Sequence, residues 1–89
     1  MPDVQHDASA HAFTAAVDGG TAELEYQRDG DQIVFTHTFV PEDARGQNLG
    51  TALVEAGLAY AREHSLTVVP QCPFVASYVE EHPEAQDLL

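Results

Sequence analysis

The stretch that decides the fold is VPEDARGQNLGTALVEAGLAYAREH, residues 40–64. Two glycines and an asparagine lie within residues 46–50, and from Leu49 apolar residues recur at helical spacing, which predicts a helix that ends near His64. The first amides of a helix lack partners and carry partial positive charge, so a flexible loop at a helix start is typical of a phosphate-binding site. The spacing alone is equally compatible with an ordinary glycine-rich entry into a helix.

The segment before this stretch predicts strands. Polar and apolar residues alternate in three runs joined by glycine-containing turns, at residues 11–17, 21–27 and 32–40. Short turns join antiparallel strands, so we expect a three-strand antiparallel meander that Pro41 ends. In the third strand, alternation predicts one face with the side chains of Ile33, Phe35, His37 and Phe39.

The segment after the helix completes the predicted architecture. The continuous apolar run at residues 66–72 indicates a strand covered on both faces, and Pro73 suits the first position of a second helix that Pro83 closes. We expect residues 1–10 to be a flexible tail and residues 11–89 to be one domain. The predicted fold class is α/β (α+β), with a meander, then helix, strand and helix, and the helices packed on one central sheet.

The charge balance is strongly acidic. The chain has 15 Asp and Glu residues, three arginines and no lysine, for a formal net charge of -12. Such a surface repels nucleic acid and anionic membranes, so neither is an expected partner. A folded acidic chain without lysine is favoured in molar salt, where charge repulsion is screened, and we therefore infer a halophilic source. The alternative is an acidic domain that binds a basic partner.

Location and metal content follow from what the sequence lacks. The chain has neither an apolar run of membrane-spanning length nor a signal-like start, which predicts a soluble cytoplasmic protein. Its single cysteine, Cys72, excludes an internal disulfide. A zinc site made by His37, Cys72 and His82 is not expected, because their spacing matches no compact ligand pattern, so no metal is predicted.

Four segments together resemble a known family. They are His37-Thr38-Phe39-Val40, the loop Arg45 to Gly50, Cys72-Pro73-Phe74 with Tyr78, and His82-Pro83-Glu84. This combination, spread over residues 33–89, resembles the small single-domain branch of the GNAT superfamily of acetyl-CoA-dependent N-acetyltransferases. Asn48 stands where the family loop usually has glycine, and Phe39 where relatives often carry glutamate. The chain also lacks the first helices with which larger members enclose the amine, so its acceptor site is either open or completed by another subunit.

The resemblance implies transfer of an acetyl group from acetyl-CoA to an amine. Backbone amides of Thr38, Phe39 and Val40 would polarise the carbonyl. The cofactor would further be bound by the loop and helix start, at Arg45, Gly46, Gln47, Asn48, Leu49, Gly50 and Thr51. The alternative is a non-catalytic module that kept the fold and binds acyl-CoA or another protein. The sequence does not identify the amine or the oligomeric state.

Three residues are candidates for catalysis. Cys72 precedes the second helix, whose dipole favours a thiolate, so it is a candidate nucleophile or acid; a buried structural thiol is equally compatible. Tyr78, by the resemblance, would protonate the leaving thiolate, and core packing with a wetted hydroxyl is its alternative. His37 is a candidate base, because imidazole is a common general base in proteins, or else a histidine of the core.

Overall fold

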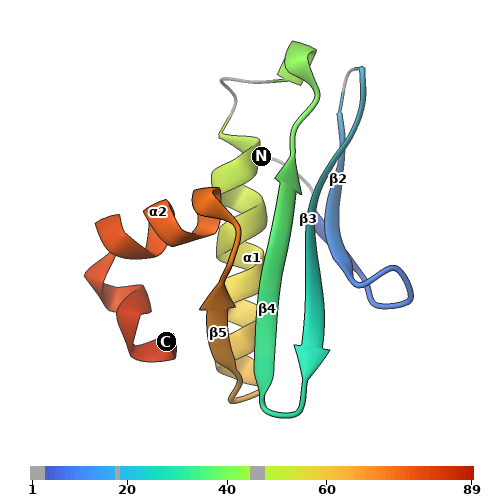
Figure 1. The fold of residues 1–89 in the computed structure, drawn as a ribbon. Coiled ribbons are helices and arrows are strands. Elements are labelled where there is room, and N and C mark those ends of the chain that lie inside the picture. The colour runs from blue at the N-terminus through green and yellow to red at the C-terminus, as the bar shows by residue number, and fades with distance from the viewer. Residues whose placement is uncertain (1–3, 18, 45–47) are drawn as a thin grey trace.

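The computed structural model describes residues 4–17, 19–44 and 48–89, and within these residues five strands form one sheet (Figure 1). The strands are β1 (Val4–Asp7), β2 (Ala12–Val17), β3 (Gly20–Asp29), β4 (Gln32–Phe39) and β5 (Thr67–Pro70). They lie in sequence order, antiparallel from β1 to β4, whereas β4 and β5 are parallel. The predicted α/β class and the meander through β2, β3 and β4 are confirmed.

Helices follow the meander in the predicted order. The 3₁₀ helix η1 (Glu42–Ala44) is followed by α1 (Leu49–Glu63), which crosses from the end of β4 to the start of β5 and covers one face of the sheet (Figure 1). Helix α2 (Pro73–Glu81) and the 3₁₀ helix η2 (Pro83–Leu88) lie beside β5 (Figure 1). The parallel pair requires this crossover, because parallel strands cannot be joined by a tight turn.

The core fills the space between α1 and the sheet. Its largest fully buried side chains are Phe35, Leu24, Ile33, Leu53, Val54 and Val75. Gly57 lies in the middle of α1, where a Cβ atom would stand 2.8 Å from Cε1 of Phe35 and 3.2 Å from Cδ2 of Leu24. The helix therefore approaches the sheet closely at this glycine.

A β-bulge in β4 changes which side chains face α1. Glu25 pairs with His37 and Tyr26 with Phe35, so Thr36 has no register partner in β3. Because the extra residue reverses the alternation, the side chains beyond it exchange faces. The prediction that His37 and Phe39 share a face with Phe35 is therefore wrong, and both side chains are exposed.

Two further expectations are corrected. Val4–Asp7 pairs with β2 as an edge strand, so the expected flexible tail does not extend over these residues. The four residues of β1 are too few to show the alternation of polar and apolar residues by which a strand is predicted. The strand predicted at residues 66–72 is shorter, and as β5 it lies at the edge of the sheet with Thr67 exposed, so it is not covered on both faces.

None of the helices in the described parts of the chain has the length and apolar character needed to cross a bilayer.

Candidate functional site

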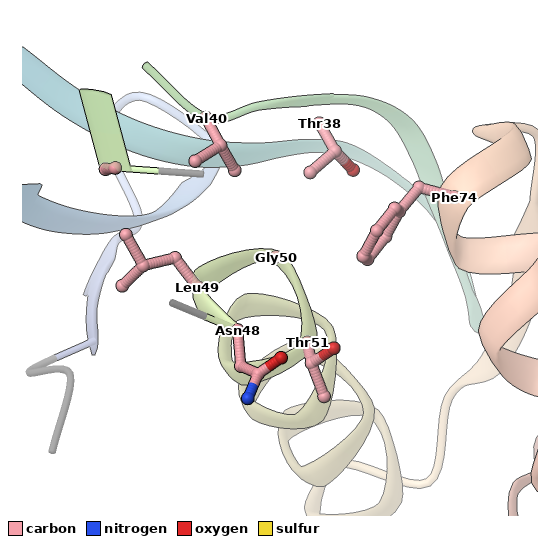
Figure 2. Close-up of a pocket in the computed structure, with 8 residues that line it drawn as sticks. Thr38, Val40, Asn48, Leu49, Gly50, Thr51 and Phe74 are labelled. Atoms are coloured by element: carbon pink, nitrogen blue, oxygen red, sulfur yellow. The ribbon is translucent and has the colours of Figure 1, made fainter. Parts of the chain in front are cut away.

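A cavity of about 390 Å³ lies between the end of β4 and the start of α1 (Figure 2). Its lining combines β4, η1, α1 and α2, through Thr38, Val40, Ala44, Asn48, Leu49, Gly50, Thr51 and Phe74. The bulge in β4 turns Thr38 toward this cavity, and Thr38 pairs in the sheet with the buried Leu24. The cavity thus depends on the irregularity that the alternating pattern did not predict.

The start of α1 forms one wall of the cavity. Asn48 caps the helix in the left-handed conformation, with φ 59° and ψ 27°, and makes no side-chain capping hydrogen bond. The first helical bond runs from the Ala52 amide to the Asn48 carbonyl at 3.0 Å, so the helix itself offers no acceptor to the amides of residues 49–51. The first turn also carries no acidic side chain. This end of the helix is suited to a negatively charged group.

Only some of the residues predicted to bind the cofactor lie in the described parts of the chain. Of these predicted residues, Thr38, Val40 and residues 48–51 line the cavity. The side chain of Phe39 lies on the other face of the sheet, next to Glu23. Arg45, Gly46 and Gln47 lie outside the described residues, so the part of the loop that precedes Asn48 stays a prediction.

Cys72 lies behind the wall of the cavity. Phe35 is the last residue of β4 that pairs with β5. Its carbonyl accepts a hydrogen bond from the Cys72 amide at 2.8 Å. This bond places the start of α2 beside the bulge. The Cys72 sulfur is buried and lies 3.1 Å from Oγ1 of Thr38, which faces the cavity from β4. The structure therefore joins the predicted thiol to one of the predicted cofactor-binding residues.

The surroundings of Cys72 favour its thiolate. Burial raises the pKa of the thiol, but the Thr38 hydroxyl and the nearby backbone amides of Val75, Phe74 and Thr38 together lower that pKa below its ordinary value. A thiol with a lowered pKa is a better nucleophile at neutral pH because more of it is ionised. The groups around the buried Cys72 thus favour ionisation of its thiol.

Gly50 and Phe74 are in contact across the cavity. A Cβ atom on Gly50 would stand 2.7 Å from Cζ of Phe74. The backbone of Gly50 is not in the left-handed region, so it is the missing side chain that matters here and not conformational freedom. Phe74 was not among the predicted site residues, and neither was Ala44. An aromatic residue directly after Cys72-Pro73, at the predicted start of a helix, is the sequence signal that could have indicated Phe74.

Tyr78 is not among the residues that line the cavity, and it contacts α1 from α2. Its hydroxyl donates to Oε2 of Glu55 at 3.4 Å, and its ring stacks on His82 with centroids 3.9 Å apart. Burial, followed by the negative charge of Glu55, raises the pKa of Tyr78. The hydroxyl thus remains protonated at neutral pH, with Glu55 as its acceptor.

His37 is exposed on the face of the sheet opposite α1 and does not line the cavity. It is separated from Cys72 by the plane of the sheet, because Cys72 contacts Thr38 on the face toward α1. Among the described residues, no three His, Cys, Asp or Glu side chains come together in a group that could hold a metal ion.

Comparison with protein families gives one match to nearly the whole chain. Residues 12–88 match the model of the GCN5-related N-acetyl-transferase family. The match includes β2 to β5 and both α-helices, and thus every residue that lines the cavity.

Individual relatives agree with this match. The chain is 34% identical over 88 residues to Protein NATD1 of Gallus gallus, covering 96% of this chain and 80% of the relative. Protein NATD1 of Homo sapiens is also 34% identical, with 96% and 78% covered. The solution structure of a GCN5-like protein from Staphylococcus aureus superposes with a TM-score of 0.77 at 27% identity, covering 97% of this chain and 85% of that one.

Proposed function

Because the chain belongs to the GCN5-related N-acetyltransferase family, we propose that it transfers an acetyl group from acetyl-CoA to an amine. The observation that carries the proposal is the cavity between β4 and α1, with the Cys72 sulfur 3.1 Å from the hydroxyl of Thr38 on its wall. One end of this cavity suits an anion and the other adjoins an activated thiol. A CoA thioester has the same two chemical ends.

Binding of acetyl-CoA is supported by the start of α1. The amides of Leu49, Gly50 and Thr51 precede the first intrahelical bond, and no acidic side chain in this turn opposes a phosphate. The loop residues Arg45, Gly46 and Gln47 complete the proposed pyrophosphate site. The largely apolar lining of the cavity suits the thioester end of the donor.

The proposed chemistry begins at Cys72. Its sulfur attacks the carbonyl carbon of the donor, so a new thioester bond forms at Cys72 while the bond between that carbon and the CoA sulfur breaks. The proton lost by Cys72 ends on the released CoA thiol. The Thr38 hydroxyl holds the Cys72 thiolate, and backbone amides at Thr38 to Val40 are the proposed donors to the carbonyl oxygen.

The second step is attack by a neutral amine on the acetylated Cys72. A nitrogen–carbon bond forms, the carbon–sulfur bond breaks, and a proton from the amine returns to the thiolate. His37 lies across the sheet from the sulfur, so it is the proposed base that takes a proton from the ammonium form of the amine before the amine reaches Cys72. In a direct route without an acetylated cysteine, Tyr78 is the proposed acid, and its hydroxyl would have to leave Glu55.

A non-catalytic acyl-CoA-binding or interaction module is the second candidate. It is favoured by the positions of the acid and base candidates, since Tyr78 is bonded to Glu55 and His37 lies on the other side of the sheet. A binding module needs only the cavity and the helix start. The two candidates differ in turnover and not in affinity.

The test measures binding first and turnover second. Because a ligand that binds only the folded state stabilises it, millimolar CoA in molar salt should raise the Tm of the wild type by several degrees. Gly50→Val should abolish this shift, because its Cβ would displace the Phe74 ring into the cavity. Ala59→Val, at an exposed position of the same helix, is the matched control and should keep the shift.

Turnover is then read as release of free CoA thiol from acetyl-CoA in the presence of a pool of amines. Thiol release that needs both acetyl-CoA and an amine supports the enzyme. A Tm shift without any thiol release supports the binding module. If the wild type shows no shift with millimolar CoA in molar salt, the enzyme and the acyl-CoA-binding module are both wrong, and of the candidates only an interaction module is left.

A further inference from the structure

The Phe74 ring stands in the cavity itself. Phe74 is the second residue of α2, its side chain is 44% exposed, and its ring projects from α2 into the space between Thr38 and the first turn of α1 (Figure 2). A large apolar side chain at a helix start gains little by facing solvent. The ring instead packs beside Gly50 so closely that no room is left for a Cβ atom at that position.

This contact explains why position 50 is a glycine. The three ring atoms Cζ, Cε1 and Cε2 of Phe74 would lie 2.7, 3.1 and 3.3 Å from a Cβ atom there, closer than side chains normally pack. Because Gly50 is not in the left-handed region, the backbone itself would accept alanine. The glycine therefore allows the Phe74 ring to lie across the first turn of α1.

The ring is also close to the thiol in the fold. Phe74 follows Cys72 by two residues, and the Phe74 amide helps to lower the pKa of that thiol. Thr38, which contacts the Cys72 sulfur, lines the same cavity as the ring (Figure 2). A thioester carbonyl brought to Cys72 would therefore have the Phe74 ring as a neighbour.

We propose that Phe74 sets the size of the acyl group that this site accepts, with Gly50 holding its ring in the cavity. The inference rests on the proposed acyl-CoA function and adds its specificity: acetyl groups fit beside the ring, whereas longer acyl chains compete with it for space. In apolar pockets one methylene changes discrimination by roughly 10- to 200-fold, so a ring-sized obstacle has a large effect.

The experiment measures Kd in molar salt for CoA, acetyl-CoA, butyryl-CoA and hexanoyl-CoA. The wild type should bind butyryl-CoA and hexanoyl-CoA at least about tenfold more weakly than acetyl-CoA. Phe74→Ala should bring the affinities for the three acyl-CoAs within about threefold of one another. Leu89→Ala removes another exposed apolar side chain, outside the cavity, and should keep the wild-type profile.

A pair of variants tests the contact itself. Gly50→Ala should push the ring further into the cavity and weaken acetyl-CoA more than CoA. Adding Phe74→Ala to Gly50→Ala should cancel most of that loss, because the added methyl group then meets no ring. Additive effects of the two substitutions would contradict the proposed role of Gly50.

The outcomes separate this inference from the function on which it rests. If the wild type does not bind CoA, the proposed function is wrong, and this inference with it. If CoA binds but the wild type accepts all chain lengths equally, or Phe74→Ala keeps the wild-type discrimination, only the role of Phe74 is overturned. Circular dichroism of each variant confirms that the compared proteins are folded.

Discussion

At the scale of the residue, a hydrogen-bond contact joins Thr38 and Cys72, which are far apart in the sequence. The two side chains come from β4 and the start of α2, 34 positions apart, and their oxygen and sulfur atoms are 3.1 Å apart. A threonine hydroxyl can donate to a thiolate and stabilise it. The reactivity of Cys72 therefore depends on its neighbour in space as well as on the helix that follows it.

Thr38→Val should raise the pKa of Cys72 toward the ordinary value for a thiol, because it removes the hydroxyl that favours the thiolate and keeps the shape of the side chain. The measurement is the rate of Cys72 alkylation as a function of pH, whose midpoint should move upward. Thr36→Val is the control, since its hydroxyl donates to the Glu25 carbonyl and not to the sulfur. An unchanged midpoint in Thr38→Val would contradict this account.

Cys72→Ala separates the chemical from the structural role of the thiol. As a nucleophile, Cys72 should become acetylated by acetyl-CoA alone, detectable by mass, and the variant should fold and bind CoA without turnover. The stability cost should be modest, on the order of 1 kcal/mol, since one buried sulfur is lost. Full turnover per folded molecule in the variant would assign Cys72 to packing; slow turnover without acetylated enzyme would favour direct attack with Tyr78 as acid.

At the scale of the element, β1 is held to the sheet by aromatic contacts. The ring of His6 stacks on Phe13 with centroids 4.5 Å apart, meets Tyr60 at 4.6 Å and forms a hydrogen bond with the Tyr26 hydroxyl. Burial is the main cause that lowers the pKa of His6; Asp7 opposes this, and nearby His64 adds to it. The contacts of β1 are thus made mainly by a neutral imidazole.

Acid should therefore loosen β1 before the rest of the sheet. A histidine with a lowered pKa in the folded state binds fewer protons than in the unfolded state, so its contribution is complete above the unfolded pKa, about 6.5, and is lost as pH falls through the folded value. Hydrogen exchange in β1, corrected for the intrinsic pH dependence, should accelerate from pH 7.5 to pH 5. His6→Phe should remove this acceleration and His37→Gln should retain it; equal protection of β1 at both pH values would refute the idea.

Helix α1 is pressed onto the sheet at Gly57. Alanine is favoured over glycine in a helix by about 1 kcal/mol, but a Cβ atom here would meet Phe35 at 2.8 Å, and overpacking costs typically about 1–3 kcal/mol. Gly57→Ala should therefore be net destabilising by about 1 kcal/mol, lowering the Tm by roughly 4–8 °C. A Tm equal to or above that of the wild type would show that the interface between α1 and the sheet can accommodate the added methyl group.

At the scale of the whole molecule, negative charge dominates. Two of the three arginines are already engaged, Arg62 with Asp87 at 2.8 Å and Arg28 with the Tyr60 hydroxyl at 3.1 Å, and Arg45 lies outside the described residues. Most of the 15 acidic residues therefore have no cation of the chain to pair with. Screening by salt is the remaining way to reduce their repulsion.

Both stability and CoA affinity should fall as salt is removed. The Debye length grows from ~3 Å at 1 M to ~30 Å at 10 mM, so repulsion within the domain, and between the domain and an anionic ligand, increases. The Tm and the Kd for CoA should be measured across this range. Replacing exposed Glu80 and Glu81 by glutamine should weaken the salt dependence, and full stability with unchanged affinity at 10 mM would refute the inferred adaptation to salt.

Much of this protein was determined by local sequence patterns. The helix from Leu49, the strands on either side of Gly30, the helix begun by Pro73 and the acidic surface all follow from periodicity, turn residues and composition, which act over a few residues. The start of α1, where Asn48 adopts the left-handed conformation, likewise lies where the sequence predicts a helix entry.

Only the tertiary structure decided the rest of the site. The bulge at Thr36 turns Thr38 toward the cavity and His37 away from it, and no alternating pattern can reveal one extra residue. The parallel pairing of β4 with β5 brings Cys72 to Thr38, and Gly50 is explained by Phe74 and not by its own loop. These features arise from contacts between residues that are far apart in the sequence. Such contacts depend on the packed fold, and they produce no periodic pattern of polar and apolar residues from which they could be predicted.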